Sequence, residues 1–129
     1  MRKVLFILML ICNISAFGQK LGHAYHFDFD SKSISRTGEF KDWKECRDCF
    51  MELYDESSLL TLADSKLGTF TFIVSKVEKD EENNAMVLTC TGKGCSTVCT
   101  VAWQHKYMTF TFDDVALKYR ISASHEENY

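Results

Sequence analysis

Five cysteines are the residues of this chain whose type and spacing could do chemistry. Two of them form the motif Cys46-Arg-Asp-Cys49, and the other three, Cys90, Cys95 and Cys99, lie within the ten residues CTGKGCSTVC. Cysteines at such spacings occur in disulfide frameworks, in redox-active dithiols and in zinc sites. The compartment and the elements that carry the cysteines decide among these three chemistries.

The N-terminus predicts secretion. Arg2 and Lys3 precede an apolar run, Val4 to Cys12, that is far shorter than the roughly 18 to 20 residues that span a bilayer, and no later segment reaches that length. Small residues at Ala16 and Gly18 suit signal peptidase, so we expect residues 1–18 to be a cleaved signal peptide. The mature protein is then soluble and secreted or periplasmic.

A lipoprotein is the less favoured alternative. It would be acylated at Cys12, but the residue before an acylated cysteine is normally small, and here it is Ile11.

The charge of the mature chain argues against a nucleic-acid partner. Removing Arg2 and Lys3 from the 15 basic residues leaves 13 against 18 acidic residues, a net charge of −5. Phosphate binding needs a clustered basic face, whereas the lysines of segment 76–82 alternate with acids.

Disulfides are the default for cysteines in an oxidising compartment. If Gly92 and Lys93 form a two-residue hairpin turn, Cys90 stands opposite Cys95, with Cα atoms about 4.5 Å apart, at the short end of the disulfide range. Alternation then turns Cys99 toward the core.

Cys99 could meet Cys46 or Cys49 from another part of the sheet, and one cysteine would remain unpaired. Fifteen ways of forming two bonds among five cysteines stay open on the sequence alone.

Redox and zinc chemistry are the alternatives for the same residues. Arg47 and Lys44 could stabilise a thiolate of Cys46 or Cys49. However, redox motifs of this type stand at a helix N-terminus in an α/β fold, and on a regular strand the two cysteines would be about 10 Å apart. Zinc is disfavoured because the later cysteines do not form a second C-x-x-C knuckle. We therefore predict no metal site and no cofactor.

The polar and apolar residues alternate with the period of β-strands. We predict an all-β single domain over residues 19–122, an antiparallel meander of about eight short strands that closes as a small barrel or sandwich, and a polar, flexible tail over residues 123–129. The candidate strands are His23–Asp30, Glu39–Lys44, Phe50–Tyr54, Leu59–Ala63, Thr69–Val77, Ala85–Thr91, Cys95–His105, Tyr107–Phe112 and Ala116–Ser122.

Aromatic residues on the later strands are candidates for a ligand or partner surface, although most large apolar residues belong to a core. They are Trp103, Tyr107, Phe110, Phe112 and Tyr119. His26, Asp28 and Asp30 would share one face of the first strand, for which a polar outer face is the simplest interpretation. The chain carries none of the standard catalytic motifs, so we assign no catalytic residue.

Several short motifs resemble small secreted proteins of Bacteroidota that have no assigned activity. They are Ala16-Phe-Gly-Gln19, Phe40-Lys-Asp-Trp43, Leu59-Leu-Thr-Leu-Ala63, the cysteines around Gly92, and Lys118-Tyr-Arg-Ile121. The resemblance implies a secreted all-β protein and adds no catalytic residue.

The sequence therefore favours a secreted, disulfide-stapled binding or interaction domain, with an envelope or extracellular protein or a small apolar ligand as its partner. A thiol-disulfide redox protein that uses the CRDC motif is one alternative. A carrier of a small apolar ligand in a barrel interior is the other.

Overall fold

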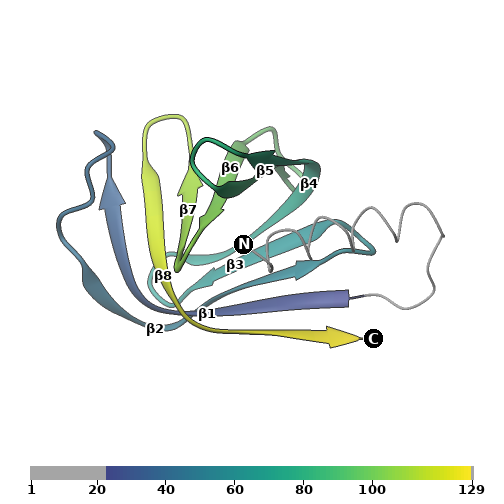
Figure 1. The fold of residues 1–129 in the computed structure, drawn as a ribbon, viewed down its shortest axis with the longest axis horizontal. Coiled ribbons are helices and arrows are strands. Elements are labelled where there is room, and N and C mark those ends of the chain that lie inside the picture. Colours follow the sequence, from purple (N-terminus) through teal and green to yellow (C-terminus); the bar gives the residue numbers. More distant parts are fainter. Residues whose placement is uncertain (1–22, 129) are drawn as a thin grey trace.

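Eight antiparallel strands make up most of residues 23–128, the part of the chain that the computed structural model describes (Figure 1). Each strand pairs with the next, and β8 pairs with β1, so the sheet closes as a barrel. The strands are β1 (His23–Ser35), β2 (Lys44–Tyr54), β3 (Leu59–Asp64), β4 (Gly68–Asp80), β5 (Ala85–Gly92), β6 (Val98–Gln104), β7 (Tyr107–Thr111) and β8 (Ala116–Asn128). The predicted all-β meander is confirmed. The predicted signal peptide and Cys12 lie outside the described residues.

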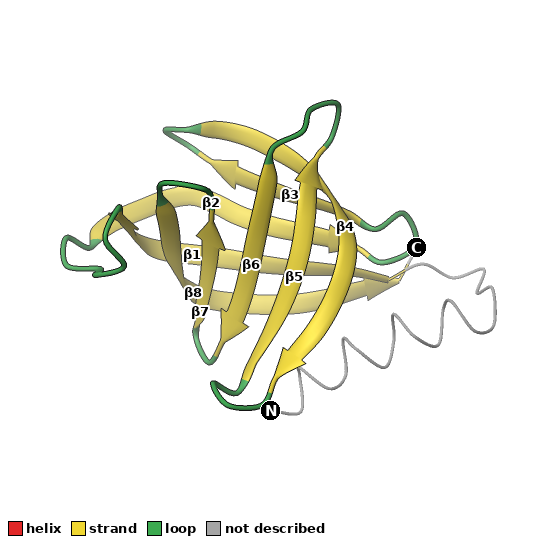
Figure 2. Cartoon of the chain, turned by 90° about the horizontal axis from the view of Figure 1, so that it is seen from above, coloured by secondary structure: helices red, strands yellow, loops and turns green. Residues whose placement is uncertain are grey.

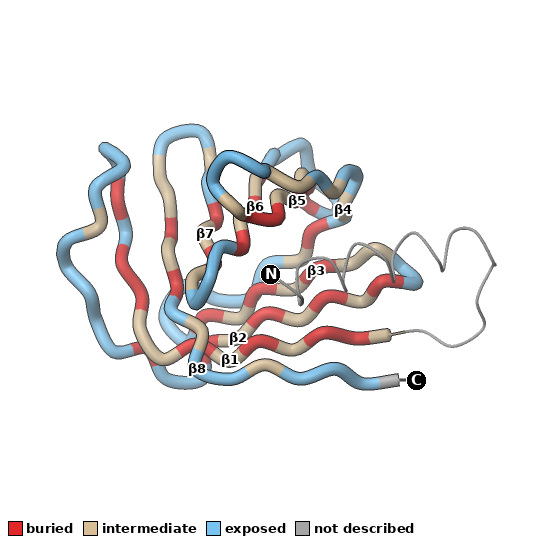
Figure 3. The backbone as a smooth tube through the Cα atoms, in the orientation of Figure 1, coloured by how far each residue is buried: buried red, intermediate tan, exposed pale blue. Residues whose placement is uncertain are grey.

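The barrel interior is filled by alternate side chains of the strands. In β3, for example, Leu60 and Leu62 are completely buried while Leu59, Thr61 and Ala63 are not. Figure 3 shows this alternation along the strands. An eight-stranded barrel is just wide enough for side chains to fill. The largest fully buried side chains are Tyr119, Phe110, Met51, Leu60, Leu62, Met86 and Met108.

The long strands β1, β2 and β8 bend sharply and cross under β5 and β6 at a steep angle (Figure 2). Their pairing registers shift in the bend: β1 shifts against β2 between Phe29 and Ser31, and against β8 both there and between Asp28 and Phe29. Extra residues in one strand of a pair bend that strand and increase its twist. The bulges thus let β1, β2 and β8 bend as they run around the barrel.

A buried ion pair joins three strands near one end of the barrel. Lys32 Nζ of β1 lies 2.7 Å from Asp64 Oδ2, and the Tyr119 hydroxyl of β8 donates to the same oxygen at 2.8 Å. Asp64 Oδ1 accepts from the amides of Lys66 and Leu67 and so closes the β3–β4 turn. Both oxygens of this carboxylate thus accept hydrogen bonds from other groups of the protein.

Several predicted boundaries were wrong, and two of the differences are large. Residues 39–43 belong to the connection between β1 and β2, where the Phe40 ring contacts Lys118 and the Trp43 ring contacts Tyr107. Residues 123–128, predicted as a tail, form the second half of β8 and pair with β1 from His23 to Asp28. Their polar composition reflects an exposed strand and not a lack of structure.

Replacing Asp64 by asparagine should destabilise the fold strongly. Asp64→Asn leaves the Lys32 ammonium buried without its counter-charge, a change that costs about 3 to 5 kcal/mol of unfolding free energy. The matched control is Asp80→Asn, because Asp80 ends β4 and accepts from Asn83 in the next turn but faces solvent. Urea unfolding checks this, and equal losses in the two variants would contradict it.

The lowered pKa of Asp64 predicts that the stability of the fold decreases in acid. Burial alone raises the pKa of its carboxyl, but hydrogen bonds from Lys32, the Lys66 amide and Tyr119 outweigh burial and hold the pKa below its ordinary value of 3.8. The unfolded chain therefore binds this proton more readily, so the contribution of Asp64 to stability is complete above about pH 4 and is lost as the pH falls through the lowered pKa. The difference in unfolding free energy between wild type and Asp64→Asn should narrow from pH 6 to pH 3. A constant difference would show that Asp64 is not the titrating group.

Candidate functional site

The CRDC motif forms a disulfide across a bulge in β2. Phe29 of β1 pairs with Cys49 and Ser31 pairs with Glu45, so residues 46–48 stand opposite the single residue Asp30. The left-handed backbone of Asp48, with φ of 55°, turns the chain and brings the Cα atoms of Cys46 and Cys49 to 6.0 Å. The turn that a regular strand could not supply is thus provided by the bulge, and the two cysteines bond to each other instead of to Cys99.

The predicted register of the β5–β6 hairpin was wrong. Cys90 pairs with Cys99, not with Cys95, because five residues, 93–97, connect β5 to β6. The side chain of Cys95 lies over Gly92, where the Sγ atom would collide with any Cβ. Cys90 and Cys99 are unbonded and completely buried, whereas Cys95 is exposed. Burial raises the pKa of both buried thiols to about 12.

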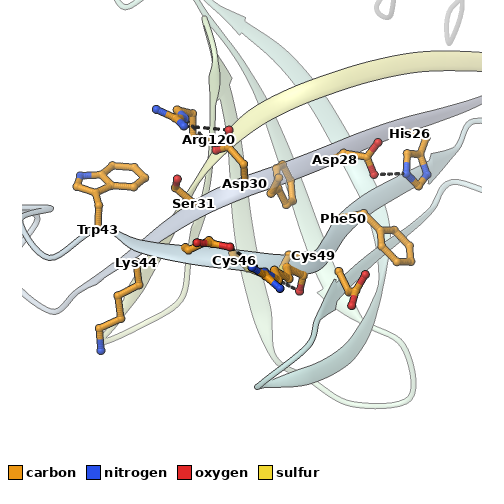
Figure 4. Close-up of a pocket in the computed structure, with 14 residues that line it drawn as sticks. His26, Asp28, Asp30, Ser31, Trp43, Lys44, Cys46, Cys49, Phe50 and Arg120 are labelled. Carbon is orange, nitrogen blue, oxygen red and sulfur yellow. Dashed lines mark hydrogen bonds and ion pairs between the residues drawn. A yellow bond between two sulfur atoms is a disulfide. The ribbon is translucent and has the colours of Figure 1, made fainter.

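A groove lies beside the bulge, between β1, β2 and the residues that enter β2 (Figure 4). Its volume is about 930 Å³, and it is open to solvent. Figure 4 shows Trp43, Asp30 and Arg120 toward one end of the groove and His26 with Phe50 beyond Cys49. The bend of the strands and the disulfide thus shape a single concave surface.

Two fixed polar groups line the groove. Arg120 donates two hydrogen bonds to Asp30, Nε to Oδ1 at 2.8 Å and Nη2 to Oδ2 at 2.9 Å, and these bonds lower the pKa of Asp30. His26 lies 2.8 Å from Asp28 Oδ1 and 3.3 Å from Glu52 Oε2. Burial lowers the pKa of His26, but the two carboxylates outweigh burial and raise it. These residues form the polar outer face expected for the first strand.

Trp43 is an exposed aromatic residue of the groove that was not predicted from the sequence as a site residue. Its side chain is 38% exposed, and its ring lies 5.7 Å from that of Tyr107, which also contacts Lys118. The signal that could have identified Trp43 is its place among polar residues in the run Glu39 to Lys44. The indole is therefore accessible and yet held by a neighbour.

Most of the predicted aromatic surface lies in the core instead. Trp103, Phe110 and Tyr119 are buried, because they occupy inward-facing positions of β6, β7 and β8. Phe112 is partly buried against Phe72, and Tyr107 lies partly exposed beside Trp43. Of the five predicted residues, Tyr107 is the one that contacts Trp43 in the groove.

A smaller hollow of about 370 Å³ opens beside Cys46. It is lined by Lys32, Glu45, Cys46, Arg47, Ser65 and Lys66. Among the described residues, Cys46, Cys49 and Asp64 also place one sulfur or oxygen atom each within 4.8 Å of the others. A carboxylate and its lysine thus lie directly behind the disulfide.

Cys90 and Cys99 are unbonded in the structure but stand directly opposite each other, so we expect them to form a second disulfide when the protein folds in an oxidising compartment. Directly opposed residues of antiparallel strands have Cα atoms about 4.5 to 5.5 Å apart, within the range that a disulfide spans. Thiol counting and peptide mapping of unreduced, denatured mature protein should then give one free thiol, Cys95. The variant Cys99→Ser should give two. Three free thiols in the wild type would contradict the predicted Cys90–Cys99 disulfide.

No family model, curated protein or solved structure matches the chain. Within residues 23–128, no helix is long and apolar enough to cross a membrane. The resemblance to small secreted proteins of Bacteroidota stays a prediction.

Proposed function

We propose that the protein is a secreted, disulfide-containing binding domain whose ligand occupies the groove beside the β2 bulge. The observation that carries this proposal is a groove of about 930 Å³ that combines an accessible tryptophan with polar groups fixed by ion pairs. Ligand sites are typically concave, with an apolar contact surface and a few oriented polar groups. The barrel interior, in contrast, is filled by buried side chains and does not favour an apolar carrier.

The charges of the groove favour a neutral ligand. Two of its three lysine and arginine side chains are matched by acids, in the bidentate Arg120–Asp30 pair and the Arg47–Glu45 pair at 2.8 Å. A strongly anionic or cationic ligand would have to break such pairs. A neutral ligand with many hydroxyl groups can instead donate to the outer carboxylate lone pairs and accept from the guanidinium.

A neutral saccharide fits both parts of the groove. The apolar face of a sugar ring can stack on the Trp43 indole while its hydroxyls reach Asp30 and Arg120. Contact with Tyr107 already orders Trp43, which reduces the entropy lost on binding.

The proposal predicts a selective loss of saccharide binding. We expect mature protein to bind neutral hexose or N-acetylhexosamine oligomers in calorimetry, with a change in tryptophan fluorescence. Trp43→Ala and Arg120→Gln should each weaken the affinity about tenfold, which corresponds to about 1.4 kcal/mol. The control is Arg36→Gln, because Arg36 is an exposed arginine that lies 3.7 Å from Asp114 outside the groove.

Trp103 gives an internal reference, because it is buried in the core and remains in the Trp43→Ala variant. Absence of binding to every oligomer tested, or equal affinity of Trp43→Ala and wild type, would overturn the saccharide proposal.

A further inference from the structure

We propose that the Cys46–Cys49 disulfide is a site of thiol–disulfide exchange, with an anionic thiol of the glutathione type as its reaction partner. This proposal does not rest on saccharide binding, although both cysteines also line the groove. It is supported by the access to the two sulfurs, by the charges of the smaller hollow and by the polar groups behind Cys49.

Access distinguishes the two sulfurs. Cys46 lines both the groove and the smaller hollow, whereas Cys49 lines the groove alone. Cys46 is 6% exposed and Cys49 is 2% exposed. Exchange requires a thiolate to reach one sulfur in line with the bond, so Cys46 is the sulfur that is attacked and Cys49 the sulfur that leaves.

The smaller hollow suits an anionic attacker. Three of its six lining side chains, Lys32, Arg47 and Lys66, are cationic. Lys32 is paired with Asp64 and Arg47 with Glu45, so Lys66 is the lining cation that has no ion pair among the described residues. A thiolate that also carries carboxylates, as glutathione does, is attracted to such a hollow. The same charges raise the local concentration of the reactive thiolate form.

The groups behind Cys49 suit a leaving thiolate. The Ser65 hydroxyl lies 3.8 Å from Cys49 Sγ and can donate to it. The Asp64 carboxylate lies within 4.8 Å of both sulfurs. Lys32, 2.7 Å from Asp64, compensates the charge of that carboxylate, so the carboxylate does not repel a thiolate at full strength.

The proposed exchange has two steps. The incoming thiolate forms a bond to Cys46 Sγ, the Cys46–Cys49 bond breaks, and its electron pair leaves on Cys49. A second external thiolate then attacks the first external sulfur and releases Cys46. Two external thiols are oxidised to one disulfide, the protein disulfide is reduced to two thiols, and the two protons pass from the external thiols to Cys46 and Cys49.

The first test is chemical and uses mature protein carrying Cys95→Ser, which removes the exposed thiol. In graded mixtures of reduced and oxidised glutathione without denaturant, trapping and mass spectrometry should show Cys46 and Cys49 passing reversibly between disulfide and dithiol. Circular dichroism should show the barrel folded throughout. A disulfide that stays intact in excess reduced glutathione until the protein unfolds would overturn the proposal.

The second test is positional. In the same background, Cys49→Ser should leave Cys46 reactive with oxidised glutathione, and Cys46→Ser should leave Cys49 at least about tenfold less reactive. Unfolding in urea should abolish the difference, which separates shielding by the fold from intrinsic reactivity. Equal reactivity of the two cysteines in the folded protein would contradict the assignment of Cys46 as the attacked sulfur.

The third test addresses the charge of the hollow. Lys66→Gln should slow reduction by glutathione about threefold and leave reduction by uncharged 2-mercaptoethanol unchanged. Lys93→Gln, in the β5–β6 connection, is the matched control and should change neither rate. Equal effects of Lys66→Gln on both reagents would overturn the role of charge in selecting the thiol.

Discussion

Burial of the Asp64 carboxylate constrains the end of the barrel on which both proposed activities depend. A carboxylate away from water is tolerated only when its lone pairs and its charge are matched. Here the donors come from β1, from β8 and from the turn that follows β3, so three strands have to meet in one register. Burial and the bond to Asp64 both raise the pKa of the Tyr119 phenol, which therefore remains a donor. Compared with a well-packed apolar cluster, such a network adds little stability, but its hydrogen bonds form only where β1, β8 and the turn after β3 meet at Asp64.

The bend of β1, β2 and β8 is the second constraint, and it produces several features at once. The extra residues opposite Asp30 give β2 the loop that Cys46 and Cys49 close. The same shift brings Arg120 of β8 beside Asp30 on the outer face. A regular strand pair would place no concavity there. The groove, the disulfide and the bidentate ion pair are therefore consequences of one local departure from β-geometry.

The sequence was sufficient to predict the features that follow from local patterns. The alternation in segments such as Leu59–Ala63 reports directly which side chains face a core, so the all-β meander was predictable. The burial of Lys32 was not, because it depends on Asp64, 32 residues further along the chain. The bulge was missed for a similar reason, since Cys46 and Cys49 bond only where the backbone of Asp48 turns into the left-handed region.

Hairpin length and pairing partners account for the remaining errors. A two-residue and a five-residue connection around Gly92 are equally compatible with the glycines and cysteines present, but they place different cysteines opposite Cys90. The polar residues after Ser122 look like a tail until the partner strand is known, because β1 offers them a complete hydrogen-bonding edge. Composition describes the side chains, whereas the register of the β5–β6 hairpin and the length of β8 depend on which strands pair with each other.

The small ring that the disulfide closes bears on how the two proposed activities relate. Cys46 and Cys49 are only three residues apart, so their bond removes little chain entropy from the unfolded state and contributes at the low end of the usual roughly 2 to 4 kcal/mol. Its main effect is therefore on the native state, where it holds residues 46–48 in the bulge that forms part of the groove wall. Reduction would release that wall while Asp64, Lys32 and Tyr119 still hold the strands behind it. A ligand that binds the closed bulge more tightly must then, by linkage, also favour the oxidised form to the same extent.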